Sequence, residues 1–178
     1  CNIFLKNTEN LLNKDNPDYW NYLSKETELT SEFIIKHLDN LNIDDICCNQ
    51  KLNNSIIKNK NFIEKLSGKN WDYLIQFTNL DEESIELYIK YCKENDKNIN
   101  WFCISKDQDL SMNFIRKYSD NIKWYWISQE QFMIFEFIIE FREKIDWEVL
   151  PYNEELQYLF SDAFVHLFQE MPLWKNIG

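Results

Sequence analysis

The chain has 178 residues, of which 44% are hydrophobic and 16% aromatic, and this composition excludes a disordered protein. Only two glycines and three prolines leave few tight turns, so a hairpin-rich β fold is disfavoured. The formal net charge of −11 disfavours non-specific binding to nucleic acid or to an anionic membrane, and we predict neither as a partner.

The first stretch, CNIFLKNTENLL, has no basic region followed by an apolar one, so no signal peptide is predicted from it. It begins at Cys1 rather than Met, which leaves open whether residues upstream are missing. No apolar run approaches the roughly 18 residues of a membrane-spanning helix. The cysteines are odd in number and form no CxxC pair, so we expect reduced thiols, no disulfide and a cytoplasmic protein.

A repeated phrase then organises most of the chain. Residues 98–108 read NINWFCISKDQ and residues 121–131 read NIKWYWISQEQ, so both contain I-x-W-x-x-I-S-x-x-Q. With the Trp of this phrase as position 0, copies begin at Trp20, Ile43, Trp71, Trp101, Trp124 and Trp147. Every copy has a hydrophobic residue at +3 and at +9. In two places, after the copies at Ile43 and Trp71, the next copy begins later than elsewhere. The extra residues lie between +14 and the next position 0, where we expect loops.

Each copy is predicted to contain two short helices. Positions 0, +3, +4 and +7 share one face of a first helix, which we expect to end near +8. Position +10 carries residues that typically cap a helix N-terminus, namely Thr30, Asn53, Asp81 and Ser111. A second helix should therefore begin just after +10 and bury positions +13, +14 and usually +17.

The predicted fold class is all-α, with tandem two-helix repeats stacked as an α-solenoid-like array, because one copy is too small to bury its own hydrophobic face. We predict a single repeat domain over residues 18–174, a helical segment or cap over 1–17 and a tail over 175–178. The position-0 tryptophans should occupy equivalent, largely buried places. A compact bundle of amphipathic helices is the alternative, although a bundle has no reason to preserve one register.

The pattern W-x-x-I-S-x-x-Q-x-L-S-x-x-F-I resembles tandem repeats in uncharacterised proteins of giant DNA viruses, such as the mimivirus group. The likeness is clearest at Trp101–Ile115 and Trp124–Ile138 and weakest at Ile43–Ile57. The resemblance implies a repeat architecture and a viral origin, with the host-cell cytoplasm as the location. It carries over no activity and no functional residue.

Residues that could support catalysis or metal binding are sparse. Neither His37 nor His166 has another His or a Cys at helical spacing, so we predict no metal site. The repeated Ser at +4 is interpreted as a small packing residue, and the Gln at +7 as bonding backbone groups at the end of the first helix. With two glycines, no Gly-rich phosphate loop is possible. We therefore predict no catalytic residues and no cofactor.

One surface feature suggests a binding site. Positions +1 and +2 lie roughly opposite the inward face of the first helix, and the candidate partner-binding residues there are Tyr22, Tyr73, Phe102, Tyr125 and Trp126. The competing interpretation, which we favour, is that these aromatic side chains belong to a core buried on both faces of the helix.

The predicted function is a non-catalytic protein–protein interaction scaffold with a basic or neutral protein partner, and the oligomeric state stays open. We expect the partner to contact variable positions rather than shared ones. These positions carry Tyr22, Lys25, Glu26, Tyr73, Gln76, Phe77, Phe102, Lys106, Tyr125, Trp126, Gln129 and Glu130. The alternative is an enzyme, or an accessory domain of one, with a carboxylate-based site; nucleic-acid binding through sparse lysines is a weaker third.

Overall fold

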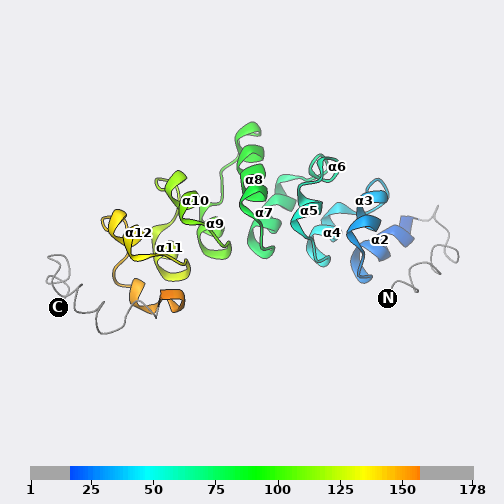
Figure 1. Ribbon diagram of the computed structural model, residues 1–178. Coiled ribbons are helices and arrows are strands. Elements are labelled where there is room, and N and C mark those ends of the chain that lie inside the picture. The colour runs from blue at the N-terminus through cyan, green and yellow to red at the C-terminus, as the bar shows by residue number, and fades with distance from the viewer. Residues whose placement is uncertain (1–16, 157–178) are drawn as a thin grey trace. The chain divides into compact units, whose positions relative to one another are not determined.

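A computed structural model describes residues 17–156, and this part of the chain is all-helical, without strands. The chain divides into two compact units, unit 1 over Cys1–Ile99 and unit 2 over Asn100–Gly178. Figure 1 shows that the described part of each unit consists of short helices joined by short connections. The predicted segment 1–17, except Pro17, the second helix of the last copy and the tail 175–178 lie outside the described residues.

The helices of both units follow the predicted two-helix pattern over the first five copies. Unit 1 contains α2 (Pro17–Glu26), α3 (Ser31–Lys36), α4 (Ile43–Asn49), α5 (Asn54–Ile57), α6 (Lys60–Ile63), α7 (Gly68–Phe77) and α8 (Glu82–Glu94). Unit 2 contains α9 (Trp101–Asp107), α10 (Met112–Lys117), α11 (Trp124–Glu130), α12 (Phe135–Glu140) and the 3₁₀ helix η1 (Leu150–Tyr152).

The helix boundaries recur at fixed offsets from position 0. The first helices α2, α4, α7, α9 and α11 all end at +6, two residues earlier than predicted. The second helices α3, α5, α8, α10 and α12 all begin at +11, as predicted. The caps predicted at +10 are confirmed, because the side chains of Thr30, Asn53, Asp81 and Ser111 each accept a hydrogen bond from the backbone N–H three residues later.

The core is formed by the shared positions of the repeat. Buried residues on the first helices include Ile46, Leu74, Ile104 and Ile127 at +3. The second helices bury Ile34, Ile57, Ile85, Ile115 and Ile138 at +14. Within unit 1, α4 contacts both α2 and α7, and within unit 2, α9 contacts α11. Consecutive first helices therefore pack on one another inside each unit.

A polar link joins consecutive copies at the same offsets in both units. In unit 2, the Ser105 hydroxyl at +4 accepts a hydrogen bond from the backbone N–H of Lys123 at 2.8 Å. Gln131, at +7 of the next copy, donates from Nε2 to the Gln108 carbonyl at 2.8 Å and accepts from the Leu110 N–H at 2.9 Å.

Unit 1 repeats this link with Ser24 and Gln50. The Ser24 hydroxyl accepts from the N–H of Asn42 at 3.0 Å, and Gln50 bonds the carbonyl of Thr27 and the N–H of Leu29, both at 2.9 Å. The prediction that the Gln at +7 bonds backbone groups is confirmed, although this backbone belongs to the preceding copy. The Ser at +4 is buried, as expected for a packing residue, and also accepts a hydrogen bond.

The aromatic residue at position 0 packs on the residue at +17 in both units. The ring centroids are 5.2 Å apart for Trp20–His37, 6.0 Å for Trp71–Tyr88, 5.0 Å for Trp101–Tyr118 and 5.0 Å for Trp124–Phe141. The predicted equivalence is therefore confirmed for these four. Burial differs, however, because Trp20 and Trp71 are buried while Trp101, Trp124 and Trp147 are half-buried.

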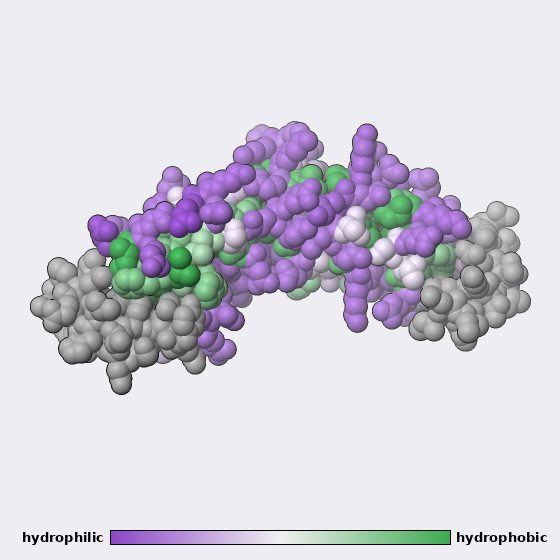
Figure 2. Space-filling model, in the orientation of Figure 1, coloured by the Kyte–Doolittle hydropathy of each residue, from purple (hydrophilic) through white to green (hydrophobic). Residues whose placement is uncertain are grey.

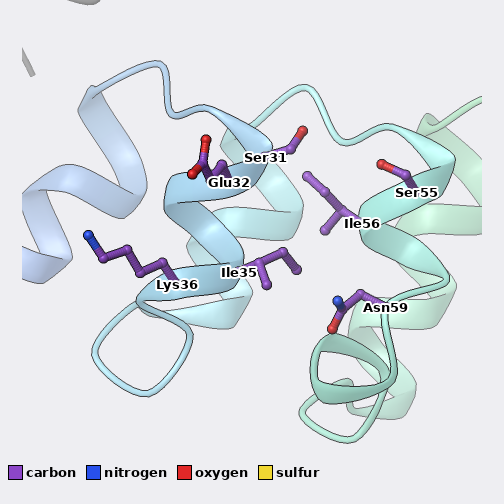
Figure 3. Close-up of a pocket in the computed structure, with 7 residues that line it drawn as sticks. All are labelled: Ser31, Glu32, Ile35, Lys36, Ser55, Ile56 and Asn59. Carbon is purple, nitrogen blue, oxygen red and sulfur yellow. The ribbon is translucent and has the colours of Figure 1, made fainter.

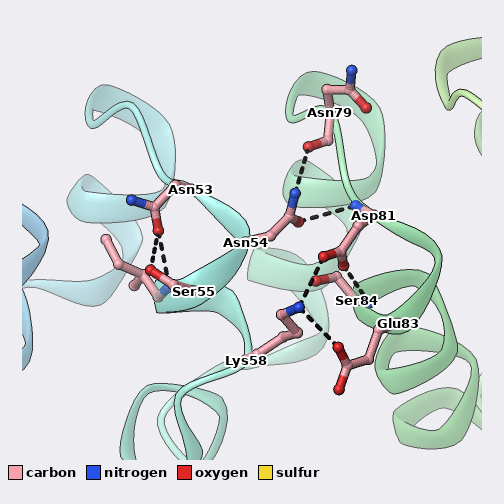
Figure 4. A network of polar contacts seen from close by, with 9 residues as sticks. Asn53, Asn54, Ser55, Lys58, Asn79, Asp81, Glu83 and Ser84 are labelled. Carbon is pink, nitrogen blue, oxygen red and sulfur yellow. Dashed lines mark hydrogen bonds and ion pairs between the residues drawn. The ribbon is translucent and has the colours of Figure 1, made fainter.

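Two insertions expected to be loops contain helix. Residues 58–70 include α6 and the start of α7, and residues 91–94 extend α8 by a further turn. Figure 4 shows how the first insertion begins, with Lys58 reaching from the end of α5 to Asp81 at 2.9 Å and Glu83 at 2.8 Å near the start of α8. These insertions add packed structure rather than loops alone.

The copy that begins at Trp147 departs from the prediction of a helix pair. Its first half forms turns and the 3₁₀ helix η1 rather than an α-helix. Pro151 occupies +4, where three other copies have Ser, and a proline there removes an N–H donor and clashes with the preceding turn. Asn153 nevertheless bonds the carbonyls of Ser128 and Gln131, both at 2.9 Å, and so replaces the usual Gln.

Candidate functional site

The variable positions of the first helices form the candidate interaction surface. Each of the variable-position side chains named above, from Tyr22 to Glu130, is exposed or half-buried. The shared positions +3 and +14 are buried in all of the first five copies, whereas none of these variable positions is buried. On the face drawn in Figure 2, hydrophilic residues cover most of the surface, and hydrophobic residues show in small patches between them.

Unit 2 gathers three of the predicted binding residues into one aromatic cluster. The Phe102 and Trp126 rings meet edge to face with centroids 5.5 Å apart, and Tyr125 and Trp126 meet likewise at 4.9 Å. The Lys106 ammonium lies 4.8 Å from the Trp126 ring centroid and 5.6 Å from that of Phe102. We call Phe102, Lys106, Tyr125 and Trp126 the α9–α11 cluster. It combines large apolar area with a cation held over aromatic rings.

Unit 1 places its aromatic residues differently. Tyr73 packs on Phe77 of the same helix, with centroids 4.6 Å apart, and its hydroxyl donates to the Cys48 carbonyl on α4 at 3.2 Å. Tyr22 on α2 is 59% exposed. The copy between those of Tyr22 and Tyr73 carries Asp45 at +2, so position +2 does not hold an aromatic residue in every copy of unit 1.

The interpretation of these aromatic residues as core is wrong for three of them. Tyr22, Phe102 and Tyr125 are 59%, 46% and 45% exposed, while Tyr73 and Trp126 are half-buried. The first helices turn positions 0, +3 and +4 inward, and the side of the helix that carries +1 and +2 is left facing outward. Large exposed aromatic side chains at such positions are typical of protein-binding surfaces.

Restricting the candidate binding residues to positions +1 and +2 left out Tyr152 and Phe132, and Phe77 was named only among the variable positions. Phe77, at +6, is 62% exposed, and Tyr152, at +5 of the last copy, is 77% exposed. Helical geometry contains the signal for Phe77, because +6 lies one turn after +2 on the same outward face of α7. Lys106 at +5 was recognised only as a variable residue, and its position over Trp126 required the structure.

The surface also has open hollows, and one of them lies between two second helices. Figure 3 shows one of about 450 Å³ between α3 and α5, where Ile35 and Ile56 come from opposite sides and Ser31, Glu32, Lys36, Ser55 and Asn59 line the rim. Its hydroxyl, amide and ionic groups are spread around an open rim. They do not converge on one point, as a catalytic constellation requires.

The titratable groups show ion pairing and burial. Hydrogen bonding to Lys65 lowers the pKa of Asp39, and hydrogen bonding to Arg116 lowers the pKa of Glu140. Burial raises the pKa of Asp81, but its hydrogen bonds from Lys58 and Ser84 outweigh this and leave the pKa lowered. A general acid needs a raised carboxyl pKa at neutral pH, so these three shifts run opposite to that role.

Burial also raises the pKa of the buried cysteine thiols. It raises the pKa of Cys47 to about 12 and that of Cys103 to about 11, and it raises the pKa of Cys92. Thiolate formation at these three sites is therefore suppressed at neutral pH, which makes them poor nucleophiles. Cys48, by contrast, is exposed, and all four are free thiols.

Across residues 17–156, no group of three or more His, Cys, Asp or Glu side chains is placed to hold a metal ion. His37 packs against both Trp20 and Phe33, with ring centroids at 5.2 Å and 4.5 Å. His166 lies outside the described residues. The described helices also include none that is both long and apolar enough to cross a membrane.

Comparison with known proteins finds no relative: no protein-family model, curated protein or solved structure matches this chain. The assignment of a function therefore depends on the residues and the geometry described above.

Proposed function

We propose that this protein is a non-catalytic protein-interaction scaffold in which short two-helix repeats stack as an α-solenoid-like array. The Ser–Gln link supports the stacking, because the same side chains at the same offsets bond consecutive copies in both units. In such an array each copy contacts only its neighbours, and the outward residues of successive helices become adjacent. The resemblance to giant-virus repeat proteins adds a viral origin and a host-cell cytoplasmic location to this proposal.

The α9–α11 cluster is the observation on which the binding proposal depends. Its residues come from two consecutive first helices, and none of them occupies a shared packing position. Phe102 and Tyr125 are each nearly half exposed, so burying them against a partner would remove apolar area from water. Aromatic residues in this setting are frequent anchors of protein interfaces, and the net charge of −11 favours a basic or neutral partner.

The test compares the wild-type protein with the double variant Phe102→Ala, Tyr125→Ala. Both are immobilised and exposed to lysate of the cells in which the protein is made, and captured proteins are quantified by mass spectrometry. We expect specific partners to be captured by the wild type and reduced about tenfold or more by the variant, as for a central interface anchor.

The control for folding is the thermal midpoint, which should stay close to the wild-type value because both side chains are exposed. Glu136→Gln, an exposed substitution on α12, provides a matched surface control that should capture the same partners as the wild type. Identical capture by the wild type and the double variant, or no specific capture by either, would contradict the proposal.

A further inference from the structure

The α9–α11 cluster shows that this chain places a cation between two consecutive first helices. Lys106 extends from +5 of α9 and lies 4.8 Å from the Trp126 ring centroid, with Trp126 at +2 of the next first helix. This arrangement lets an ammonium group interact with the negative face of an aromatic ring. The residues at the same two offsets can be compared in unit 1, where α4 packs against α7.

At the joint between α4 and α7 in unit 1, the counterparts of these two residues are Cys48 and Tyr73. Tyr73 supplies the aromatic ring, but Cys48 is far shorter than lysine and lacks an ammonium group. An open hollow of about 180 Å³ lies beside Cys48 and Tyr73. The place that Lys106 fills in unit 2 is thus matched in unit 1 by a hollow.

The walls of this hollow suit a cationic side chain. Asp44 and Asp72 line it together with Tyr73, Gln76 and Phe77, and Phe77 is 62% exposed. Lys69 also lines the hollow, but its ammonium is 3.8 Å from Asp44, and both side chains are largely exposed, so this pair is weak. A cation in this hollow would be attracted by the charge of the carboxylates and by the faces of the aromatic rings.

The size of the hollow narrows the class of ligand. Pockets for small-molecule ligands usually measure about 300–1,000 Å³, so a hollow of about 180 Å³ suits one side chain better than a whole ligand. The outward faces of α4 and α7 carry Asp44, Asp45 and Asp72, which would attract neighbouring basic residues of the same segment.

We propose that the hollow between α4 and α7 binds an arginine or lysine side chain from a basic segment of a partner protein. The bound cation takes the place that Lys106 takes within the α9–α11 cluster. The proposal rests on the scaffold function proposed above and adds to it the chemistry of the partner. It concerns a site in unit 1, whereas the test of the scaffold function uses residues of unit 2.

Fluorescence anisotropy with a fluorescein-labelled hexa-arginine peptide measures this site in the full chain at about 0.15 M salt. We expect saturable binding, no binding of a labelled hexaglutamate peptide, and about tenfold weaker binding by Phe77→Ala and by Asp72→Asn. Glu136→Gln removes the same charge as Asp72→Asn at an exposed position of α12, and it should change the affinity less than twofold, about the size expected for a remote exposed charge.

Cys48→Lys is the most discriminating variant, because it gives unit 1 the lysine that unit 2 has at +5. This lysine should lie over Tyr73, fill the hollow and weaken peptide binding about tenfold or more. Asn121→Lys adds the same charge at an exposed site of unit 2 and should leave binding nearly unchanged. Equal weakening by the two variants would show general charge attraction instead of a site and would overturn the proposal.

A second measurement locates the peptide. Cys48 is an exposed thiol on the wall of the hollow, so bound hexa-arginine should slow its reaction with a neutral maleimide about tenfold, provided the peptide is near saturation. Unchanged labelling at saturating peptide would overturn the assignment to this hollow. If partner capture depends on Phe102 and Tyr125 but not on Phe77 or Asp72, the scaffold function is supported and the proposed cation site is contradicted.

Discussion

At the residue scale, hydrogen bonds of the Gln side chain at +7 connect one copy of the repeat to the preceding copy. Gln131 is only 5% exposed, yet its amide bonds two carbonyls and one N–H of the preceding copy. Buried amides must be satisfied, so the sequence correctly predicted that this residue bonds the backbone. It could not reveal which copy supplies that backbone, because the offset between Gln131 and its partners arises only when two helices pack.

The sequence also predicted which positions are shared, but not how deeply each tryptophan is buried. Trp71 is fully buried, and Tyr91, on the extended part of α8, packs near it with ring centroids 6.0 Å apart. Tyr19 packs near Trp20 in a similar way at 5.1 Å. These additional contacts come from residues outside the shared offsets, so the repeat pattern alone does not contain them.

A first prediction concerns thiol reactivity. In a Cys1→Ser background, Cys48 should react rapidly with a chromogenic disulfide reagent at pH 8, because it is exposed. Cys47 and Cys103 should react only on unfolding, since burial raises the pKa of these thiols to about 12 and about 11 and thereby removes the reactive thiolate.

The measurement is the amplitude of the fast phase in the folded protein, with Cys48→Ser in the same background as its control. That control should abolish the fast phase. A fast phase that persists without Cys48, or that corresponds to more than a single thiol, would show that the described burial of the other cysteines is wrong.

At the element scale, the second helices were predicted with the correct first residue because the signal is local. A side chain at +10 that accepts the N–H at +13 marks the start of a helix within a few residues of sequence. The ends of the first helices were placed two residues too late, because the Gln at +7 has extended backbone, with φ −94° and ψ 143° at Gln131. Leaving the helix turns this side chain towards the preceding copy, a requirement of packing rather than of helix propensity.

A second prediction concerns the cap of α8. Asp81 accepts from the Ser84 N–H at 2.9 Å and pairs with Lys58 at 2.9 Å, as Figure 4 shows. Asp81→Ala removes both contacts, and we expect it to lower the free energy of unfolding by about 1–2 kcal/mol, mostly through the lost cap. Asp81→Asn should cost less, because asparagine caps helices equally well.

The same pair of variants has a predicted pH dependence. The pKa of Asp81 is lowered in the folded protein, so its charge contributes stability above its ordinary pKa of about 4, and this contribution is lost as the pH falls through the lowered value. Urea denaturation at pH 7 and at pH 3 measures the effect. The difference in stability between the wild type and Asp81→Asn should be larger at pH 7, and a difference that grows towards pH 3 would contradict the lowered pKa.

At the scale of the whole molecule, the sequence predicted an all-helical chain, and the structure confirms this for residues 17–156. The periodic hydrophobic pattern made that possible because it is repeated and averages over local exceptions. The exceptions themselves are set by single residues or insertions: Pro151 at +4 replaces a helix by η1, and the insertion after α5 contains α6. The open hollow beside Cys48 was likewise invisible in sequence, since it depends on the packing of α4 against α7.

The last prediction distinguishes the proposed array from a compact bundle. Gln131→Ala removes an amide that bonds buried backbone groups on the α9–α11 side of unit 2, and leaving those groups unsatisfied should cost about 2–3 kcal/mol. In a stacked array, where each copy contacts only its neighbours, this loss should speed amide hydrogen exchange over α9–α12 and leave α2–α4 at wild-type protection. Gln76→Ala, at an exposed position of α7, is the control and should change neither region. In a single cooperative bundle, the protection of α2–α4 would fall together with that of α9–α12, and hydrogen-exchange mass spectrometry resolves the two outcomes because the segments give separate peptides.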